Sequence, residues 1–336
     1  MAYRRAIITQ FGGPEVLRVV EEATLPEPEP GEVRIRVLAA GVAFTDTMIR
    51  QGSYPDVKEE PPFTPGYDMV GVVDALGDGV TTLAVGQMVA ELTVIGAYSE
   101  YICLDAERLV PVPDGVDPAE AVSMILTYVT AYQMLHRKAM IENGQRILVH
   151  GAVGTALLQL GGLLDLEMYG TASEAKAGHV AALGATRIDY RHEDFVARID
   201  ELTDDGVDAV FDGIGPETFR RSFRTLRPGG TLVIFGTAAS DLSSMRAKIG
   251  LAFAALGLLV RRYLSRTRTV TGYSIAPRRR DHPEMFHEDL TALFKLVASR
   301  KIVPVIGRRV TLDEIVEAHE LIDAFAVEGK IVLTFD

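Results

Sequence analysis

The chain of 336 residues is poor in cysteine, with Cys103 as its only one. A single thiol cannot form an intramolecular disulfide, and it cannot supply a zinc site built on several thiolates. The seven histidines include no pair at metal-binding spacing. We therefore expect a cytoplasmic protein that holds no metal.

Basic residues are also scarce relative to acidic ones. The chain has 34 Lys and Arg against 46 Asp and Glu, a formal net charge of −12. A protein that binds nucleic acid neutralises phosphates with clustered positive charge. This balance argues against nucleic acid as a partner.

Long hydrophobic runs are missing as well. The first fifteen residues have no apolar core and no small-residue cleavage pattern, so they are not typical of a secretory signal. The longest apolar run, residues 249–260, is shorter than the roughly 20 residues that a membrane-spanning helix needs. We expect a buried or cleft-lining helix there and no stable membrane insertion, with an interfacial role at a membrane as the alternative.

What the first third does contain is strand pattern. Residues 32–38 alternate charged and apolar side chains, which predicts a half-buried strand. Short β-branched or apolar segments at 69–77, 87–92 and 97–104 follow, separated by glycine turns, and indicate a barrel-like β unit. Asp117 and Pro118 then predict the N-cap and first turn of a helix.

From residue 146 to residue 237 the pattern alternates between apolar strands and helices. Such alternation predicts a parallel sheet covered on both faces, the doubly wound arrangement that binds nucleotides. The last sixty or so residues add no further strand–helix repeat, so we expect them to complete the first domain. Within them we predict strands at 269–275 and 330–335, helices at 287–301 and 312–325, and a solvated loop at 277–283.

A glycine turn joins the first alternating strand to its helix, in "HGAVGTA". In such a turn the backbone N–H groups can approach a pyrophosphate, and the helix N-terminus adds partial positive charge. A plain tight turn between strand and helix is the alternative. The predicted phosphate contacts are Gly151, Ala152, Val153, Gly154 and Thr155.

The end of the second strand indicates which dinucleotide would bind. NAD sites carry Asp or Glu there to accept hydrogen bonds from the ribose 2′-hydroxyl. This chain has Ser173 and Lys176, with Glu174 one step beyond the strand. A hydroxyl and an ammonium suit a 2′-phosphate and favour NADP. The alternative is that Lys176 is an ordinary solvated helix lysine.

Several motifs together resemble the zinc-independent quinone oxidoreductase branch of the medium-chain dehydrogenase/reductase family, in register from about Arg4 to the end of the chain. The resemblance implies an α/β protein: a GroES-like catalytic domain (1–124 and 276–336) and an inserted Rossmann domain (125–275). It implies NADPH in the cleft between them and a homodimer joined at the 269–275 strand. The motifs are "FGGPEVLRV", "GVAFTDTMIRQGSYP", "PGYDMVGVV", "GAYSEY", "LTYVTAYQML" and "FDGIGPETF".

The sequence departs from the family pattern in several places. The zinc-binding branch has Cys and His ligands near Ala43 and at Tyr67, and neither is present. Ala43 stands where an asparagine is frequent, and Met48 where some quinone reductases have tyrosine. Relatives read "HGAxGGVG" at the phosphate turn, so this turn is about three residues shorter. The loss of amides should weaken its hold on a pyrophosphate.

The resemblance also implies site residues. Tyr54 matches a tyrosine that donates a proton in related enoyl thioester reductases, and Thr127 and Asp46 are the other predicted catalytic residues; the alternative for Tyr54 is a packed loop residue with its hydroxyl in solvent. Asp212 is expected to cap the turn after its strand, and His179 and His319 to be plain helix residues. Beyond the phosphate turn, Ser173 and Lys176, the predicted cofactor contacts are Thr130, Tyr190, Gly213, Ile214, Gly236, Thr237 and Lys330.

The leading hypothesis is an NADPH-dependent reductase that passes hydride to a quinone or an α,β-unsaturated carbonyl, either an enone or an enoyl thioester. The cofactor carries the reactive hydrogen, so the protein needs to align the reactants and exclude water. The second hypothesis is a cofactor-impaired binding or regulatory protein that keeps the fold. An alcohol dehydrogenase is a third possibility, although polarising its carbonyl would require the missing zinc.

Overall fold

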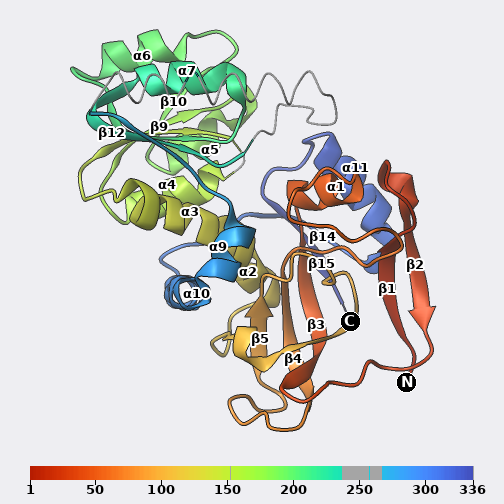
Figure 1. The fold of residues 1–336 in the computed structure, drawn as a ribbon. Helices are drawn as coiled ribbons and strands as arrows, with labels where there is room; N and C mark the ends of the chain where they lie inside the picture. Colours follow the sequence, from red (N-terminus) through yellow and green to blue (C-terminus); the bar gives the residue numbers. More distant parts are fainter. Residues whose placement is uncertain (152, 237–256, 258–266, 336) are drawn as a thin grey trace. The chain divides into compact units, whose positions relative to one another are not determined.

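The computed structural model describes residues 1–151, 153–236, 257 and 267–335. The chain divides into two compact units (Figure 1). Unit 1 comprises Met1–Val129 and Ile275–Asp336, and unit 2 comprises Thr130–Ser274. We keep 1–124 with 276–336, and 125–275, as the predicted domain limits, and we describe each unit by itself.

The long strand β3 (Glu32–Val42) organises the main sheet of unit 1. Its alternate residues Val33, Ile35 and Val37 are fully buried, as the period-two pattern predicts. The sheet runs in the order β14-β15-β3-β4-β5-β7, and β6 also pairs with β3. Its other strands are β4 (Met69–Leu76), β5 (Met88–Glu91), β6 (Tyr101–Asp105), β7 (Val110–Pro111), β14 (Ile306–Val310) and β15 (Lys330–Thr334).

The end of the chain completes this sheet, which confirms the predicted return of the tail. β15 pairs antiparallel with β3, and β14 pairs parallel with β15. The sequence analysis did not foresee β14, whose two adjacent arginines obscure the strand pattern. The smaller elements of unit 1 are β1 (Tyr3–Ile8), η1 (Pro14–Val16), β2 (Leu17–Glu22), α1 (Phe44–Arg50), η2 (Ala106–Arg108), α10 (Pro283–Ala298), η6 (Leu312–Glu314) and α11 (Ile315–Asp323).

The predicted solvated loop at 277–283 is wrong. Its residues belong mainly to helix α9 (Ile275–Asp281). Arg279, in the middle of the arginine triplet, is only 11% exposed and forms an ion pair with the fully buried Glu91 at 3.1 Å. Arg108 contacts the same carboxylate at 3.0 Å. The triplet looked solvated because its buried partner lies far away in the sequence.

One continuous helical stretch crosses the boundary between the units. It begins with α2 (Pro118–Ser123), whose predicted N-cap is confirmed because the Asp117 side chain accepts hydrogen bonds from the amides of Ala119 and Glu120. Two π-helical segments, which often occur at functional sites, then flank a short α-helix. They are η3 (Met124–Tyr128) and η4 (Met134–Ala139), on either side of α3 (Val129–Gln133).

Unit 2 is built on a parallel sheet in the order β10-β9-β8-β11-β12-β13. Figure 1 shows α6 and α7 on one face of the sheet and α4 on the other, so the predicted doubly wound arrangement is confirmed. The strands are β8 (Arg146–His150), β9 (Glu167–Thr171), β10 (Thr186–Ile188), β11 (Val207–Asp212), β12 (Leu226–Ile234) and β13 (Thr269–Gly272). The helices are α4 (Gly154–Gly162), η5 (Glu174–Lys176), α5 (Ala177–Ala182), α6 (Phe195–Leu202) and α7 (Pro216–Arg224).

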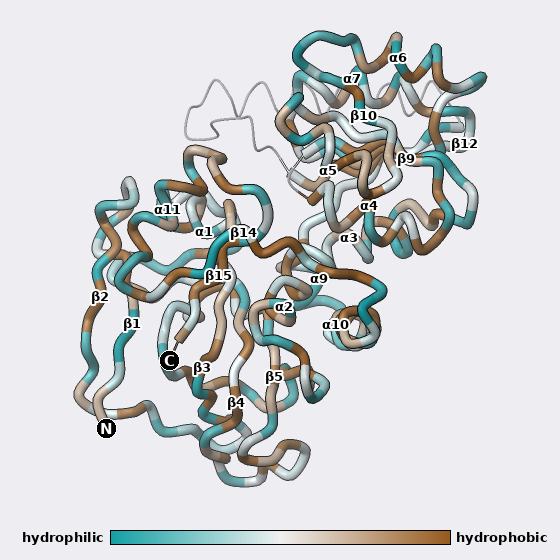
Figure 2. Tube along the Cα trace, turned by 180° about the vertical axis from the view of Figure 1, so that it is seen from behind, coloured by the Kyte–Doolittle hydropathy of each residue, from teal (hydrophilic) through white to brown (hydrophobic). Residues whose placement is uncertain are grey.

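One hydrophobic cluster of unit 2 lies between this sheet and helices α6 and α7. Leu148, Val210, Ile199 and Phe219 are among its buried members. Figure 2 shows the hydrophobic colour concentrated on the strands around β9. The strand predicted at 269–275 is confirmed as β13, which is one of the two outer strands of this sheet among the described residues, the other being β10. β12 starts at Leu226 and accommodates Pro228 and Gly229 inside the strand.

No helix within the described ranges reaches the length and hydrophobicity needed to cross a bilayer. The apolar run at 249–260 lies outside the described residues, apart from Gly257.

Candidate active site

The carboxyl ends of the parallel strands in unit 2 bring several predicted cofactor contacts together. Gly151 directly follows β8, and Gly213 and Ile214 directly follow the neighbouring β11. The amide of Gly213 donates to the carbonyl of His150 at 3.2 Å, which holds the two turns side by side. Ligands of open parallel sheets bind at this edge. Three of the predicted contacts therefore lie close together, and their binding of a cofactor stays a prediction.

Backbone geometry explains why glycines occupy these turns. Gly151 has a φ of +105°, a region that L side chains rarely adopt. A Cβ on Gly151 would lie 3.5 Å from the Cα of Gly213 and 3.6 Å from the Cδ1 of Ile214. A Cβ on Gly236 would lie 3.4 Å from the carbonyl oxygen of Gly213. The three turns thus present bare backbone at close range, which suits an extended ligand that contacts amides.

The shortened turn after β8 passes straight into α4, so the predicted strand–turn–helix is confirmed. Val153 is the N-cap, and the amide of Gly154 donates to the carbonyl of Gly151 at 3.2 Å. The Thr155 hydroxyl contacts Nε2 of His179, a residue of α5, at 3.0 Å. Ala152 and Thr237, two further predicted contacts, lie outside the described residues. One amide of this turn is therefore already used within the protein.

The end of β9 carries the residues predicted to select the dinucleotide. Ser173 precedes η5, and Lys176 closes η5 with an exposed side chain. The carboxylate of Glu174 binds the guanidinium of Arg187 at 2.6 Å. Tyr190, the remaining predicted residue of this region, is 54% exposed. The acidic group nearest to this strand end is thus paired with a cation.

Two buried side chains form hydrogen bonds close to this edge of the sheet. Asp212 accepts from the Ile214 amide at 3.0 Å and from the Ser222 hydroxyl at 2.6 Å, so its predicted role as a turn cap is confirmed. His150, which the sequence analysis missed, contacts the Thr171 hydroxyl through Nδ1 at 2.8 Å. Burial lowers the pKa of His150 to about 4, so the imidazole is neutral near pH 7. The sequence signal that could have identified His150 is its position at the end of the strand that leads into the glycine turn.

Unit 1 contains a separate cluster of buried polar groups, centred on Asp68. This fully buried carboxylate accepts from the amide of Gly41 at 3.0 Å, from the amide of Leu126 at 3.3 Å and from Nζ of Lys330 at 3.1 Å. A Cβ on Gly41 would come within 2.3 Å of that Nζ. A larger residue at position 41 would therefore have to displace the Lys330 ammonium or the Asp68 carboxylate. The predicted cofactor contact of Lys330 stays a prediction, with its ammonium on Asp68.

Asp46, a predicted catalytic residue, is buried beside Asp68 but has fewer partners. Its Oδ2 accepts from the Ala43 amide at 2.9 Å, and its Oδ1 has no hydrogen-bond partner among the described residues. Burial, together with the negative charge of Asp68, raises the pKa of Asp46 to about 7. Two neighbouring carboxyl groups with such different surroundings are the arrangement that separates a proton-holding acid from a fixed anion.

The cluster continues through Tyr98 and His319. The Tyr98 hydroxyl lies close enough to Asp46 to lower the pKa of that carboxyl, without meeting it in hydrogen-bond geometry. Its ring stands edge-on to His319, with centroids 5.9 Å apart. His319 lies in α11, as predicted, and its Nδ1 is 3.0 Å from the guanidinium of Arg50. Burial and Arg50 lower the pKa of His319 to about 3, so this histidine is neutral.

The Tyr54 hydroxyl has a partner within the protein, so the part of the alternative that leaves this hydroxyl in solvent is wrong. The catalytic assignment of Tyr54 stays a prediction. The hydroxyl lies 2.6 Å from the hydroxyl of Tyr67, and the two rings meet edge-on at 5.7 Å. Tyr67 is fully buried. Tyr54 also lines an open pocket of about 290 Å³, together with residues that include Phe11 and Ile49. One tyrosine therefore connects an open pocket to a buried phenol.

Two further predicted site residues lie in the helical stretch from α2 to η4. Thr127 is half-buried in η3 of unit 1, and Thr130 is buried in α3 of unit 2. Their assignments stay predictions. Burial raises the pKa of the Cys103 thiol to about 11, so this thiol is unreactive near neutral pH. Within the described ranges, no group of three or more His, Cys, Asp or Glu side chains could hold a metal ion.

Comparison with known families matches both parts of the chain. The alcohol dehydrogenase GroES-like domain matches residues 29–114. A family described as zinc-binding dehydrogenase matches residues 183–333. These matches, and similar solved structures, confirm the predicted fold class of a GroES-like unit with a Rossmann-type parallel sheet.

Individual relatives agree over almost the full length. A quinone oxidoreductase of Pseudomonas aeruginosa is 34% identical, covering 98% of this chain and 99% of its own length. A 2-haloacrylate reductase of Burkholderia is 32% identical, covering 98% of each chain. The crystal structure of Escherichia coli quinone oxidoreductase complexed with NADPH superposes with a TM-score of 0.87 at 29% identity, covering 99% of this chain and 100% of that one. The chain therefore belongs to the medium-chain dehydrogenase/reductase family of oxidoreductases, in its zinc-independent quinone oxidoreductase branch.

Proposed function

We propose that the protein is an NADPH-dependent reductase that passes hydride, without zinc, to a quinone or an α,β-unsaturated carbonyl. The observation that carries the proposal is the cradle of bare backbone at the carboxyl edge of unit 2. There Gly151, Gly213 and Gly236 approach one another at the strand ends. The similar Escherichia coli enzyme, whose structure holds NADPH, supports this cofactor.

The preference for NADP over NAD rests on the end of β9. Glu174 is the acidic residue that would accept hydrogen bonds from a ribose diol, and it is paired with Arg187. Ser173 and the exposed Lys176 can instead meet a 2′-phosphate with a hydroxyl and an ammonium. The bound cofactor would supply the hydride. The protein would hold the pyrophosphate on the amides of the glycine turns.

The proposed acceptor class matches the chemistry that the Tyr54 phenol and the Asp46 carboxyl group can supply. Hydride addition to a conjugated carbonyl or a quinone leaves an oxyanion or enolate that needs one proton, and no Lewis acid is required for that step. Tyr54, at the wall of an open pocket, is the proposed proton donor. The Pseudomonas and Burkholderia relatives are named for acceptors of these two classes.

A cofactor-impaired binding protein is the second candidate, and one observation favours it. The Gly154 amide, which a phosphate would use, already donates to Gly151 within the shortened turn. In that case the glycine turns would keep their shape but would no longer bind a cofactor tightly. Inserting three small residues between Ala152 and Val153 would then strengthen NADPH binding by at least tenfold.

Fluorescence titration with NADPH and NADH tests the proposal. We expect saturable NADPH binding, at least tenfold tighter than NADH binding, and NADPH oxidation with some member of a panel of quinones, enones and enoyl thioesters. Lys176→Gln should weaken NADPH binding but not NADH binding, and Lys301→Gln, a change at an exposed lysine of unit 1, should alter neither. No saturable change at millimolar NADPH would overturn the proposed function.

We further propose that two copies associate through β13, one of the two outer strands of the described sheet, because the family resemblance implies a homodimer joined there. An exposed strand edge offers unpaired amides and carbonyls to a second copy. Sedimentation of the purified protein at several concentrations would test this, and a monomer throughout would contradict it.

A further inference from the structure

Tyr67 occupies a position that the proposed function does not yet use. Its side chain is fully buried in unit 1, and its hydroxyl lies 2.6 Å from that of Tyr54. The edge-on contact of the two rings, at 5.7 Å and 89°, fixes the direction from which the hydroxyls meet. The two residues are thirteen positions apart and join the loop after α1 to the segment before β4.

The two phenols of this pair have different surroundings. Tyr54 lines the open pocket, whereas Tyr67 is enclosed. Burial raises the pKa of Tyr67 well above its ordinary value, and the charges of Asp56 and Asp46 add to the effect. Tyr67 therefore stays a neutral phenol throughout the working pH range. A neutral phenol can donate a hydrogen bond to a partner that carries negative charge.

We propose that Tyr67 is a positioning residue that donates its hydroxyl hydrogen to the oxygen of Tyr54 and stabilises the Tyr54 phenolate formed when Tyr54 protonates the reduced substrate. This inference rests on the proposed function, because it assigns a partner to the proposed proton donor. Hydrogen bonds to a charged oxygen are stronger than those between neutral groups. The hydrogen bond from Tyr67 therefore stabilises Tyr54 mainly after Tyr54 has lost its proton.

The proton and electron balance of this step is complete. A bound, reduced nicotinamide would supply the hydride, which is one proton with two electrons, to the β-carbon of a conjugated carbonyl, and an enolate would result. The O–H bond of Tyr54 then breaks, and its proton joins the α-carbon. Tyr67 keeps its own proton. The Tyr54 phenolate regains a proton from water through the open pocket.

Tyr67→Phe tests the assignment, because it removes one hydroxyl and keeps the ring. We expect kcat with an enone to fall roughly tenfold or more, the value of one hydrogen bond to a charged group. The alkaline limb of the kcat profile should move to higher pH, because Tyr54 without its donor ionises less readily. In D2O, deuterium should enter the α-carbon of the product with reduced facial selectivity. Tyr54→Phe should abolish that selectivity.

A second edge-on pair in unit 1 supplies the matched control. Tyr3 and Tyr101 meet with centroids 6.0 Å apart and an interplanar angle of 79°. Tyr101→Phe removes a phenol hydroxyl in the same way and should leave kcat, its pH profile and the deuterium stereochemistry unchanged.

NMR of protein labelled with 13C at tyrosine Cζ gives a readout that does not need turnover. The signal missing from Tyr54→Phe identifies Tyr54, and its titration should shift to higher pH in Tyr67→Phe. If the wild type turns over and both the pH profile and the Tyr54 titration are unchanged in Tyr67→Phe, the inference is overturned while the proposed function stands. If the wild type reduces no acceptor, the proposed function fails. If the Tyr54 titration is then also the same in wild type and Tyr67→Phe, the hydrogen bond between the two tyrosines is rejected as well.

Discussion

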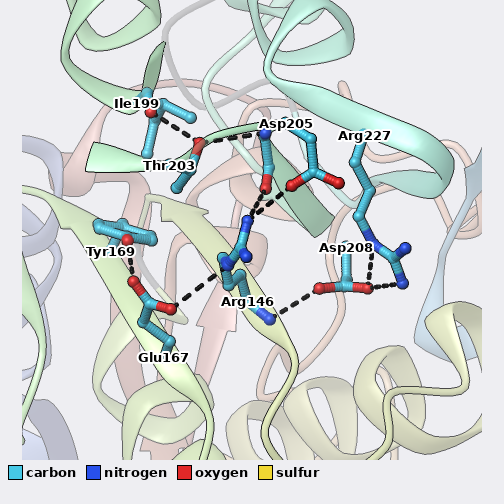
Figure 3. A network of polar contacts seen from close by, with 9 residues as sticks. Arg146, Glu167, Tyr169, Ile199, Thr203, Asp205, Asp208 and Arg227 are labelled. Atoms are coloured by element: carbon cyan, nitrogen blue, oxygen red, sulfur yellow. Dashed lines mark hydrogen bonds and ion pairs between the residues drawn. The ribbon is translucent and has the colours of Figure 1, made fainter. Parts of the chain in front are cut away.

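The two units handle their charged side chains in opposite ways. In unit 1, Asp68 and Lys330 meet in the interior with almost no exposure to water. In unit 2, a network of arginines and carboxylates lies at the amino ends of the strands (Figure 3). There Arg146 contacts Glu167 at 3.4 Å and Asp205 at 2.8 Å, and all three side chains are at least 30% exposed.

The buried charges of unit 1 alter the pKa of a neighbouring group, whereas the exposed charges of unit 2 link neighbouring strands. A buried ion pair costs desolvation energy, so its presence calls for a reason beyond stability. In unit 1 one consequence is visible: burial, together with the charge of Asp68, raises the pKa of Asp46. The glycine turns follow the carboxyl ends of the same strands, so the network in Figure 3 lies at the other end of the sheet. Water is an alternative partner for Arg146, Glu167 and Asp205, whose side chains are at least 30% exposed. The network joins neighbouring strands at little cost.

Lys330→Met should break the comparison most strongly. It leaves Asp68 buried without its cation, and removing one partner of such a pair costs about 3–5 kcal/mol. Urea unfolding at pH 7 measures the loss. The double variant Asp68→Asn with Lys330→Met should recover part of it, and Lys301→Met, at an exposed lysine, should cost little. A Lys330→Met protein as stable as the wild type would contradict the role given to the pair.

Asp46→Asn sharpens the comparison through pH. The pKa of Asp46 is raised from 3.8 to about 7, so the folded state holds an extra proton between these values. The free energy of unfolding therefore falls as pH rises through that window, and levels off above it. The variant has no such titration. Between pH 5 and pH 8 its stability relative to wild type should rise by about 2–3 kcal/mol.

Urea unfolding at both pH values gives this difference directly. Asp105→Asn, at an exposed residue of unit 1, serves as the control and should show no comparable change. Parallel pH dependence in wild type and Asp46→Asn would show that Asp46 is ionised at neutral pH.

Arg146→Ala should have the smallest effect. Its ion pairs are exposed, and exposed pairs contribute about 1 kcal/mol or less. The loss should shrink further at high salt, because screening already weakens these contacts. Thermal unfolding at low and high salt provides the measurement. A loss as large as that of Lys330→Met would mean that the two kinds of network do not differ as described.

Local patterns carried the parts of the fold that the sequence predicted. The Asp117 cap, the turn after β8 and the alternation of unit 2 each depend on residues close together in the chain. Capping, glycine turns and hydrophobic period all act over a few positions. The glycines at the strand ends are different, because Gly151, Gly213 and Gly236 are far apart in the chain and only the family resemblance linked them.

The polar cluster of unit 1 depends on residues that no local pattern connects. Asp68 and Lys330 are 262 positions apart. Asp46 was singled out, but its raised pKa depends on the burial and on Asp68, neither of which its own neighbours reveal. Tyr67 was noted only as a missing zinc ligand. Arg279 shows the same limit, since its helix and its buried Glu91 are distant in sequence.

The pairing of β15 with β3 sets an order on synthesis. Strand β3 emerges from the ribosome early, but its neighbour is made from residues 330–334, at the very end of the chain. Unit 2 is encoded by one uninterrupted segment. Unit 2 can therefore become compact before β15 has been synthesised. Until then β3 has an unpaired edge that other chains could contact.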